Sequence, residues 1–493
     1  MKKQLVKINR KVLSKEKEIN LSLDFIVPDV KPDIVAILDT NASTYIYNEE
    51  CNTGKIRLDG NVDSKVLYLS DSGETRSLSV GLDFSEVIDD EQITSDLKFY
   101  SSVELLNIES RIINERKINV VARVKIYVSF YEAKEIELIS SLDDFENLEL
   151  KEEKCKIKNL IGSNKAKASV KEVLECDTMD NILDILKVDV RIGKSENKVS
   201  YNKVLSKSDC EVKIVYQTED MNIKVKTANY PIMSFIDLEN VSEEHSLETR
   251  TNLRNMQVFL TQNETNKISI NLEFETSLQV YEIKEISIID DLYSLNKTIE
   301  FTKKEFEAEL DSEMIKNTFS IAEEVGVEDI NKIIDAKSSL RIVNKERSGT
   351  YVNYNIEVNL KLMYELDSRS GLSVKNTTFS TIAKIEEADS DETNFAIVNE
   401  NYNLNNDRVN CNIEIIGMLK KNSLKTISVL DDISEKEDES KPEYSMVVYF
   451  VKQNDTIWSI AKSFKVSVQS IINSNNIENP DKINIGDRLY IVR

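Results

Sequence analysis

Few residues in this sequence combine the side-chain types that catalysis requires. The sole histidine, His245, lies in a polar run and is followed by Ser246, but a nucleophile and its base must be adjacent in space rather than along the chain. Phosphate-binding glycine loops, zinc-binding histidine pairs and nucleophile-elbow patterns do not occur. We therefore expect no catalytic residues, no metal site, no cofactor and no enzymatic activity.

Paired carboxylates are the remaining candidates for acid and base chemistry. Two of the pairs recur at the ends of repeated segments, which favours a role at a junction or simple solvation. The pairs are Asp89-Asp90, Asp290-Asp291 and Asp431-Asp432.

The clearest candidate binding residues lie in the segment 446–493. Ile457, Ile460, Ala461 and Phe464 recur at i, i+3, i+4 and i+7, which predicts a helix with one apolar face. Asp455 or Thr456 can cap its first turn. Trp458, the sole tryptophan, lies about 100° from the centre of this face, at the edge of the core. Two interpretations stay open: Trp458 fills a gap in a small core, or it is a partly exposed anchor for a partner.

The motifs of this segment resemble the LysM family, small β-α-α-β domains that recognise N-acetylated glycans or protein partners. The resemblance rests on Tyr449-Phe450-Val451, Asn454-Asp455-Thr456-Ile457-Trp458, Val466-Ser467-Val468 and Ile485-Gly486-Asp487-Arg488-Leu489-Tyr490. It implies a glycan site between two loops, with backbone amides reading the N-acetyl group. The implied positions are Asp455, Thr456 and Ile457 in one loop, and Asn479, Pro480, Asp481, Lys482 and Ile483 in the other.

One position departs from the LysM pattern. The family has glycine before Asp-Thr, whereas this chain has Asn454. Asparagine tolerates a positive φ better than most residues, so the turn can persist. Its side chain could nevertheless obstruct a sugar at that edge of the site.

The preceding chain repeats at a spacing of 148 residues. Isoleucines at 34, 182 and 330 open similar segments, and tyrosines at 68, 216 and 364 close the strand-like runs that follow. Both anchors keep the same spacing, so three diverged copies lie in tandem.

Each copy is expected to consist largely of antiparallel strands. Apolar residues alternate in 352–364, 268–274 and 124–128, as is typical of half-buried strands. Ile34, Ile37 and Leu38 lie at i, i+3 and i+4, which predicts a short helix near the start of each copy. The expected fold class is mainly β and multidomain, with three tandem β-rich modules and a small terminal βααβ domain.

The first copy also contains a stiff turn, Val27-Pro28-Asp29-Val30-Lys31-Pro32-Asp33. This turn, together with residues 34–39 and 66–74, resembles the SPOCS domain of endospore formers. SPOCS repeats followed by one LysM domain resemble a family of clostridial spore-coat morphogenetic proteins. The predicted domains are 1–147, 148–300 and 301–434 as SPOCS-like modules, 435–445 as a flexible acidic linker, and 446–493 as the LysM domain.

Composition excludes several classes of partner. The chain has 64 basic and 87 acidic residues, a net charge of −23 that would repel nucleic acid. The first residues lack an apolar segment, and no run of about 18 apolar residues occurs, so we expect no secretion signal and no membrane span. The cysteines at 51, 155, 176, 210 and 411 are expected to be reduced thiols, with a disulfide to a neighbouring chain left open.

The family resemblance implies a non-enzymatic scaffold of spore-coat assembly, located in the mother-cell cytoplasm, at the forespore surface and in the coat. Its implied partners are stage IV sporulation protein A, the ATPase of the coat basement layer, and other coat proteins. Ile457, Trp458 and the loop 479–483 are the expected contact. The alternative is a protein that binds N-acetylglucosamine or peptidoglycan in the wall or spore cortex. The lack of an export signal and the presence of Asn454 favour the protein partner. A wall hydrolase is a third interpretation, for which we find no carboxylate constellation.

Overall fold

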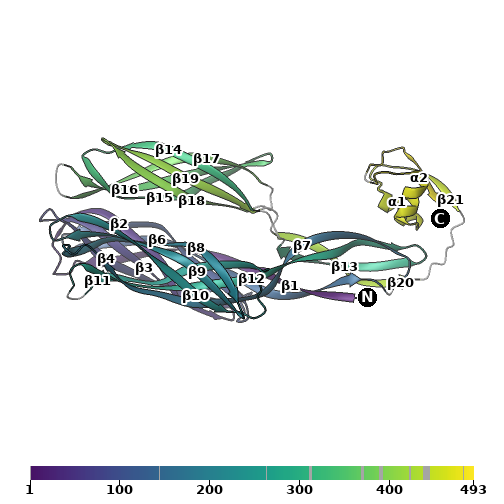
Figure 1. Cartoon of the computed structure of the whole chain (residues 1–493), viewed down its shortest axis with the longest axis horizontal. Coiled ribbons are helices and arrows are strands. Elements are labelled where there is room, and N and C mark those ends of the chain that lie inside the picture. Colours follow the sequence, from purple (N-terminus) through teal and green to yellow (C-terminus); the bar gives the residue numbers. More distant parts are fainter. Residues whose placement is uncertain are drawn as a thin grey trace.

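The chain forms an elongated molecule in which sandwiched sheets lie at one end and a small helical domain lies near the other (Figure 1). The computed structural model describes residues 2–143, 145–261, 264–309, 314–367, 371–387, 392–420, 424–436, 445–480 and 482–492. Strands dominate these residues, and the two short helices among them belong to the terminal domain. The predicted mainly β, multidomain fold class is confirmed.

Residues 2–141, the first module, fold into two three-stranded antiparallel sheets. The sheet orders are β1-β6-β5 and β2-β3-β4. Side chains from both sheets, including Val62, Val80, Val124 and Phe130, are buried in one core. The strands are β1 (Lys2–Ile26), β2 (Ile34–Asn52), β3 (Lys55–Ser70), β4 (Thr75–Asp89), β5 (Lys98–Asn114) and β6 (Lys117–Ser141).

The second module, residues 148–294, repeats this arrangement with sheets β11-β12-β7 and β10-β9-β8. Its strands are β7 (Leu148–Glu175), β8 (Ile182–Ser200), β9 (Lys203–Thr218), β10 (Ile223–Asp237), β11 (Ser246–Leu260) and β12 (Lys267–Ser294). The predicted boundary between 147 and 148 falls at the start of β7.

The third module, residues 298–436, has the same order, but its first and last long strands are each divided in two. Its sheets are β13-β20, β14-β19-β18 and β15-β16-β17. The strands are β13 (Thr298–Glu309), β14 (Met314–Gly326), β15 (Ile330–Ser348), β16 (Tyr351–Leu366), β17 (Leu372–Glu386), β18 (Glu392–Asn405), β19 (Arg408–Lys420) and β20 (Leu424–Lys436). Glu435 and Lys436, the first residues of the predicted linker, lie in β20, and residues 437–444 lie outside the described residues.

Strand β16 follows the alternation that its sequence predicts. Val352, Ile356 and Val358 are fully buried, whereas the intervening Asn353 and Asn355 are half-buried. Period-2 alternation places the apolar side chains on the sandwich side of the sheet. The predicted strand is confirmed.

The predicted short helix in each module is wrong, because Ile34, Ile182 and Ile330 begin strands β2, β8 and β15. Two register shifts interrupt each strand at equivalent places: after residues 34 and 37, after 182 and 185, and after 330 and 333. A β-bulge adds one residue and resets the alternation of side chains. Two bulges in four residues therefore mimic the i, i+3, i+4 spacing of a helix.

Beyond the sandwiches, the first and last strands of each module continue together as a two-stranded ribbon. Residues 2–11 pair with 131–141, residues 148–160 pair with 281–294, and β13 pairs with β20. The three ribbons pack on one another and form a stem. Its apolar core takes Val6, Ile136, Ile157, Ile286 and Ile427 from all three modules.

The three sandwiches meet at a central cluster of apolar residues that follow the 148-residue repeat. Residues 38, 186 and 334 contribute one leucine or isoleucine from each module, and residues 67, 215 and 363 contribute a second apolar side chain. The modules are thus arranged around an approximate threefold axis.

Ion pairs surround this apolar cluster and also follow the repeat. Lys361 of the third module donates to Asp39 of the first over 2.8 Å, and Lys213 of the second donates to Asp335 of the third. The position equivalent to these two aspartates in the second module holds Lys187, which pairs with Asp335 and, over 2.7 Å, with Asp189. Lys187 and Asp335 are only 3% and 5% exposed, so the pairs are largely shielded from water.

We expect Asp335→Ala to lower the free energy of unfolding by about 3 kcal/mol, because it removes one of the two acidic partners of buried Lys187. Thermal unfolding of the full chain measures this effect. Asp209→Ala, a change at an exposed position of β9, is the control. Equal losses in both variants would contradict a role for the buried pair.

The same junction predicts a loss of stability in acid. Burial alone would raise the pKa of Asp189, but the charges of Lys187 and Lys337 outweigh burial and lower this pKa to about 2. A lowered folded-state pKa stabilises the fold above the ordinary value of 3.8 and ceases to do so as the pH falls toward 2. We expect on the order of 2 kcal/mol to be lost across this range. Asp189→Asn should reduce the loss of unfolding free energy over this pH range. An unchanged dependence of the unfolding free energy on pH would exclude Asp189 as the cause of the loss.

Candidate functional site

The terminal domain has the predicted βααβ order and its own core. It comprises β21 (Met446–Phe450), α1 (Ile457–Phe464), α2 (Val468–Asn475) and β22 (Arg488–Val492), and the two strands pair in antiparallel fashion. Ile457, Ile460 and Ala461 are buried and Phe464 is half-buried, as the helical spacing predicts.

Helix α1 begins as its sequence predicts. Thr456 is the N-cap: its hydroxyl accepts from the Ser459 amide, and the Ser459 hydroxyl accepts from the Thr456 amide. Asp455 accepts from the Lys452 amide and the Tyr449 hydroxyl, over 2.7 and 2.8 Å. Asn454 adopts a φ of +68°, the left-handed conformation that the turn requires. The turn therefore persists without its glycine.

The second loop of the predicted glycan site is open to solvent. Asn479, Pro480 and Lys482 are exposed, Ile483 is half-buried, and Asp481 lies outside the described residues. A shallow groove of about 490 Å³ is lined by residues 475–479, 482, 483 and 487–489. Asp455–Ile457 are not among the described residues that line it, and Ile457 is buried in the core. The second loop is thus open to solvent, whereas in the first loop Thr456 is exposed, Asp455 is half-buried and Ile457 is buried.

Trp458 faces the stem. Its indole Nε1 donates to the Asp291 carboxylate over 2.7 Å, at the far end of β12. Lys462, one helical turn on, donates to the other oxygen of Asp291 over 2.5 Å. The Lys462 charge compensates that of the carboxylate, and the two hydrogen bonds together fasten α1 to the second module.

Tyr293 extends the same contact. Its ring meets Trp458 edge to face at 5.1 Å between centroids, and its hydroxyl donates to the Val466 carbonyl over 2.7 Å. The Lys462 ammonium also lies 5.5 Å from the ring centroid of Phe301 in β13. The terminal domain therefore docks on the stem through one face of α1, which leaves the groove beside residues 479, 482 and 483 outside the contact.

Electrostatics agree with this geometry. Burial alone would raise the pKa of Asp291, but the hydrogen bonds from Lys462 and Trp458 outweigh it and lower the pKa. Asp291 is consequently ionised at neutral pH and offers a full charge to both donors.

Asp291 and Tyr293 are the residues that reasoning from sequence missed. Asp290-Asp291 was interpreted as a junction or solvated pair, and the structure divides its roles. Asp290 pairs with Lys151 and Lys303 within the stem, whereas Asp291 faces the terminal domain. The available signal was Tyr293, an aromatic residue two positions after Asp291. The corresponding pair Asp431-Asp432 lacks this feature, because Ile433-Ser434 follows it.

The residues examined for catalysis do not form a constellation. His245 stays in its turn, where Nδ1 accepts from the Ser242 amide over 3.1 Å. Within the described ranges, no group of three or more His, Cys, Asp or Glu side chains could hold a metal ion. No helix in that part of the chain has the length and hydropathy needed to cross a membrane.

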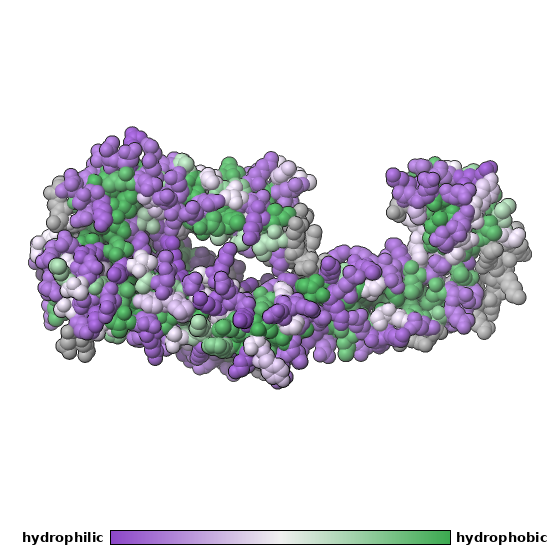
Figure 2. Space-filling model, viewed as in Figure 1, coloured by the Kyte–Doolittle hydropathy of each residue, from purple (hydrophilic) through white to green (hydrophobic). Residues whose placement is uncertain are grey.

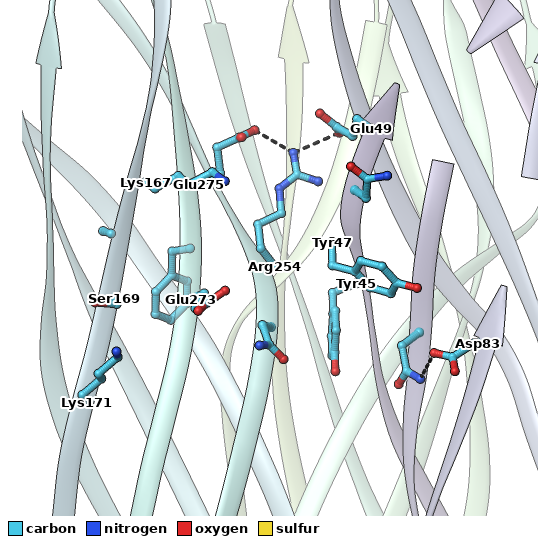
Figure 3. A pocket seen from close by; sticks show the side chains of 15 residues that line it. Tyr45, Tyr47, Glu49, Asp83, Lys167, Ser169, Lys171, Arg254, Glu273 and Glu275 are labelled. Carbon is cyan, nitrogen blue, oxygen red and sulfur yellow. Dashed lines mark hydrogen bonds and ion pairs between the residues drawn. The ribbon is translucent and has the colours of Figure 1, made fainter. Parts of the chain in front are cut away.

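A second hollow lies between the first and second modules (Figure 3). This groove of about 760 Å³ is lined by side chains of both modules, including Tyr45, Tyr47 and Lys171. At one end Arg254 of β11 donates to Glu49 of β2 and to Glu275 of β12, over 2.9 and 2.6 Å. Arg254 also donates to the Ile46 carbonyl, over 2.9 Å. These bonds join the two modules at that end of the groove. Charged and polar side chains cover much of the molecular face shown in Figure 2.

Comparison with known proteins identifies two domain types. A family model described as the LysM domain matches residues 449–492, and one described as the SipL, SPOCS domain matches residues 33–113 and 181–261. The two SPOCS matches cover equivalent parts of the first and second modules, from the start of β2 into β5 and from the start of β8 to the end of β11. The third module lies outside them, although it repeats the same strand order. No curated protein and no solved structure matches the chain.

SPOCS domains indicate a role in sporulation, and a LysM domain suggests binding of peptidoglycan or another carbohydrate. Both predicted domain types are confirmed, the LysM domain near the C-terminus and the SPOCS domain in the first two of the three predicted modules. The chain therefore contains two segments similar to the SipL, SPOCS domain and a C-terminal LysM domain, a combination that suggests a sporulation-related protein.

Proposed function

We propose that the chain is a non-enzymatic scaffold for assembly of the spore coat. It acts in the mother-cell cytoplasm at the forespore surface and binds the stage IV sporulation protein A ATPase through its LysM domain. The observation that carries the proposal is the separation of two parts: sandwiches gathered at one end, and a LysM domain held on the stem away from them (Figure 1). This arrangement suits a molecule that links a coat layer to a partner.

The loop 479–483 supplies the contact surface for the partner. Asn479, Pro480 and Lys482 are solvent-exposed, and the shallow groove beside them belongs to the same surface. Ile457 is buried in the core of the domain, and Trp458 is engaged with the stem.

Binding of peptidoglycan or N-acetylglucosamine is the second candidate. The open groove favours it, because it is concave and accessible and its lining includes the exposed side chain of Asn476. The Asn454 side chain, in place of glycine, argues against a sugar in the adjoining turn.

We expect Lys482→Glu in the full chain to weaken capture of the ATPase by about 2 kcal/mol, or roughly 30-fold, the scale of an interface hot spot. Gln469→Ala, on the exposed side of α2, should leave capture unchanged. Surface-plasmon resonance with the immobilised ATPase measures both affinities, and circular dichroism verifies folding. Equal affinities would exclude the loop as the contact.

Titration of chitotetraose into the full chain separates the two candidates. If the chain is a scaffold whose ligand is a protein, millimolar sugar should produce no saturable heat of binding. Micromolar binding that Lys482→Glu weakens, together with no capture of the ATPase, would establish the glycan alternative instead.

A further inference from the structure

The stem segment against which the LysM domain docks has the properties of a bound ligand. We propose that the α1 face of this domain recognises an extended protein segment with a carboxylate followed, two residues later, by an aromatic side chain. Asp291 and Tyr293 occupy this face as an internal ligand, and a partner segment of the same chemistry displaces them. The identity of the partner rests on the proposed function, but the recognition chemistry does not.

The donors on α1 define the first requirement. The Trp458 indole nitrogen can only donate a hydrogen bond, and so can the Lys462 ammonium. Both point at one carboxylate, over 2.7 and 2.5 Å, so an acceptor with two oxygens and a negative charge satisfies them together. An amide would supply one acceptor oxygen and no charge.

The second requirement is an aromatic ring with a donor. Tyr293 is 5% exposed, and its ring fills the space beside Trp458 while its hydroxyl satisfies the Val466 carbonyl. Residues two apart on a strand face the same side, which places Asp291 and Tyr293 together toward α1. A bound segment is therefore extended and has the pattern Asp-x-Tyr.

A β-bulge in β12 precedes Asp291 and Tyr293 in the second module. The strand pairing skips Ser140, Asp290 and Asp431 at equivalent points of the three ribbons. Such bulges re-aim the following side chains. The residues that follow read Ser-Leu-Asp in the first ribbon, Asp-Leu-Tyr in the second and Asp-Ile-Ser in the third. Only the second ribbon combines the acid with the aromatic ring, and the LysM domain docks there.

The described contact also includes Lys465, which donates to Thr298 over 3.3 Å, and Leu295, which packs against the core of the terminal domain. Residues 437–445 join the LysM domain to β20, so docking within the chain benefits from an effective concentration in the millimolar range for a short linker. A partner segment must exceed this internal competition, and occupancy by the stem lowers its apparent affinity in proportion. Only a segment that competes successfully with the stem consequently occupies this face.

Fluorescence of Trp458 tests the internal contact directly, since the full chain has a single tryptophan. We expect Asp291→Ala to shift its emission to longer wavelength and to raise quenching by acrylamide severalfold. Asp290→Ala is the matched control, because Asp290 is adjacent but binds Lys151 and Lys303 rather than α1. The same spectrum in both variants and the unaltered chain would overturn the inference.

A peptide with the sequence of residues 287–296 tests the recognition chemistry. It should bind the full chain carrying Asp291→Ala and Tyr293→Ala at least tenfold more tightly than the unaltered chain, whose site is occupied. Versions with Asn-Leu-Tyr or Asp-Leu-Ala should lose this binding. Equal binding of all three peptides, or of none, would contradict a carboxylate-aromatic site.

The same variants separate this inference from the proposed function. Capture of the ATPase should rise severalfold with Asp291→Ala relative to Asp290→Ala, and Trp458→Ala should abolish the gain. If the ATPase binds no variant while the peptide binds as expected, the proposed function fails and the recognition site stands. If the unaltered chain instead forms concentration-dependent oligomers that Asp291→Ala dissolves, the occupant is a second copy, which overturns the assignment to a different protein.

Discussion

Pairing between the first and last strands of each module is the constraint on which the rest of the structure depends. β1 pairs with β6 and β7 with β12 along nearly their whole lengths, and the split strands β13 and β14 pair with β20 and β19 in the same way. The inner half of each pair closes a sandwich, and the outer half leaves it as a ribbon. Consecutive modules consequently enter and leave at the same end, and three ribbons must share that end. Their apolar faces become the stem core, and the LysM domain begins where the last ribbon stops.

Threefold repetition provides stability, whereas departures from it provide specificity. Residues 38, 186 and 334 keep an apolar side chain at the axis in every copy. The next position is aspartate in the first and third copies but lysine in the second, so the ion pairs at the three junctions differ. At the outer end, the second ribbon alone carries Asp291 and Tyr293. A scaffold of exact repeats would offer three equivalent docking sites, and these two residues select one.

Local signals explain which parts of the structure could be predicted from sequence. The α1 and α2 helices have apolar spacing and caps such as Thr456, which act within a few residues. The alternation in β16 and the 148-residue spacing are equally local or periodic. The short helix at Ile34 was mispredicted because two bulges imitate helical spacing over five residues, and bulges depend on the partner strand β3. The contact between Trp458 and Asp291 joins residues 167 positions apart in the sequence, and no sequence periodicity indicates a contact over such a separation.

Charge adds a reason why the docked contact is polar. The segment 446–493 has six basic and four acidic residues, a net charge of +2, although the whole chain has −23. The remaining chain therefore carries −25, and a basic domain is drawn toward it. Attraction of this kind is long-ranged but weakened by salt, with a screening length of about 8 Å at physiological ionic strength. Coulomb attraction brings the LysM domain to the stem without specifying a site, and the indole, the ammonium and the Tyr293 ring determine the position at which it stops. The indole, the ammonium and the Tyr293 ring together require an acidic segment. A partner that binds this face therefore carries negative charge, as does the stem segment that it displaces.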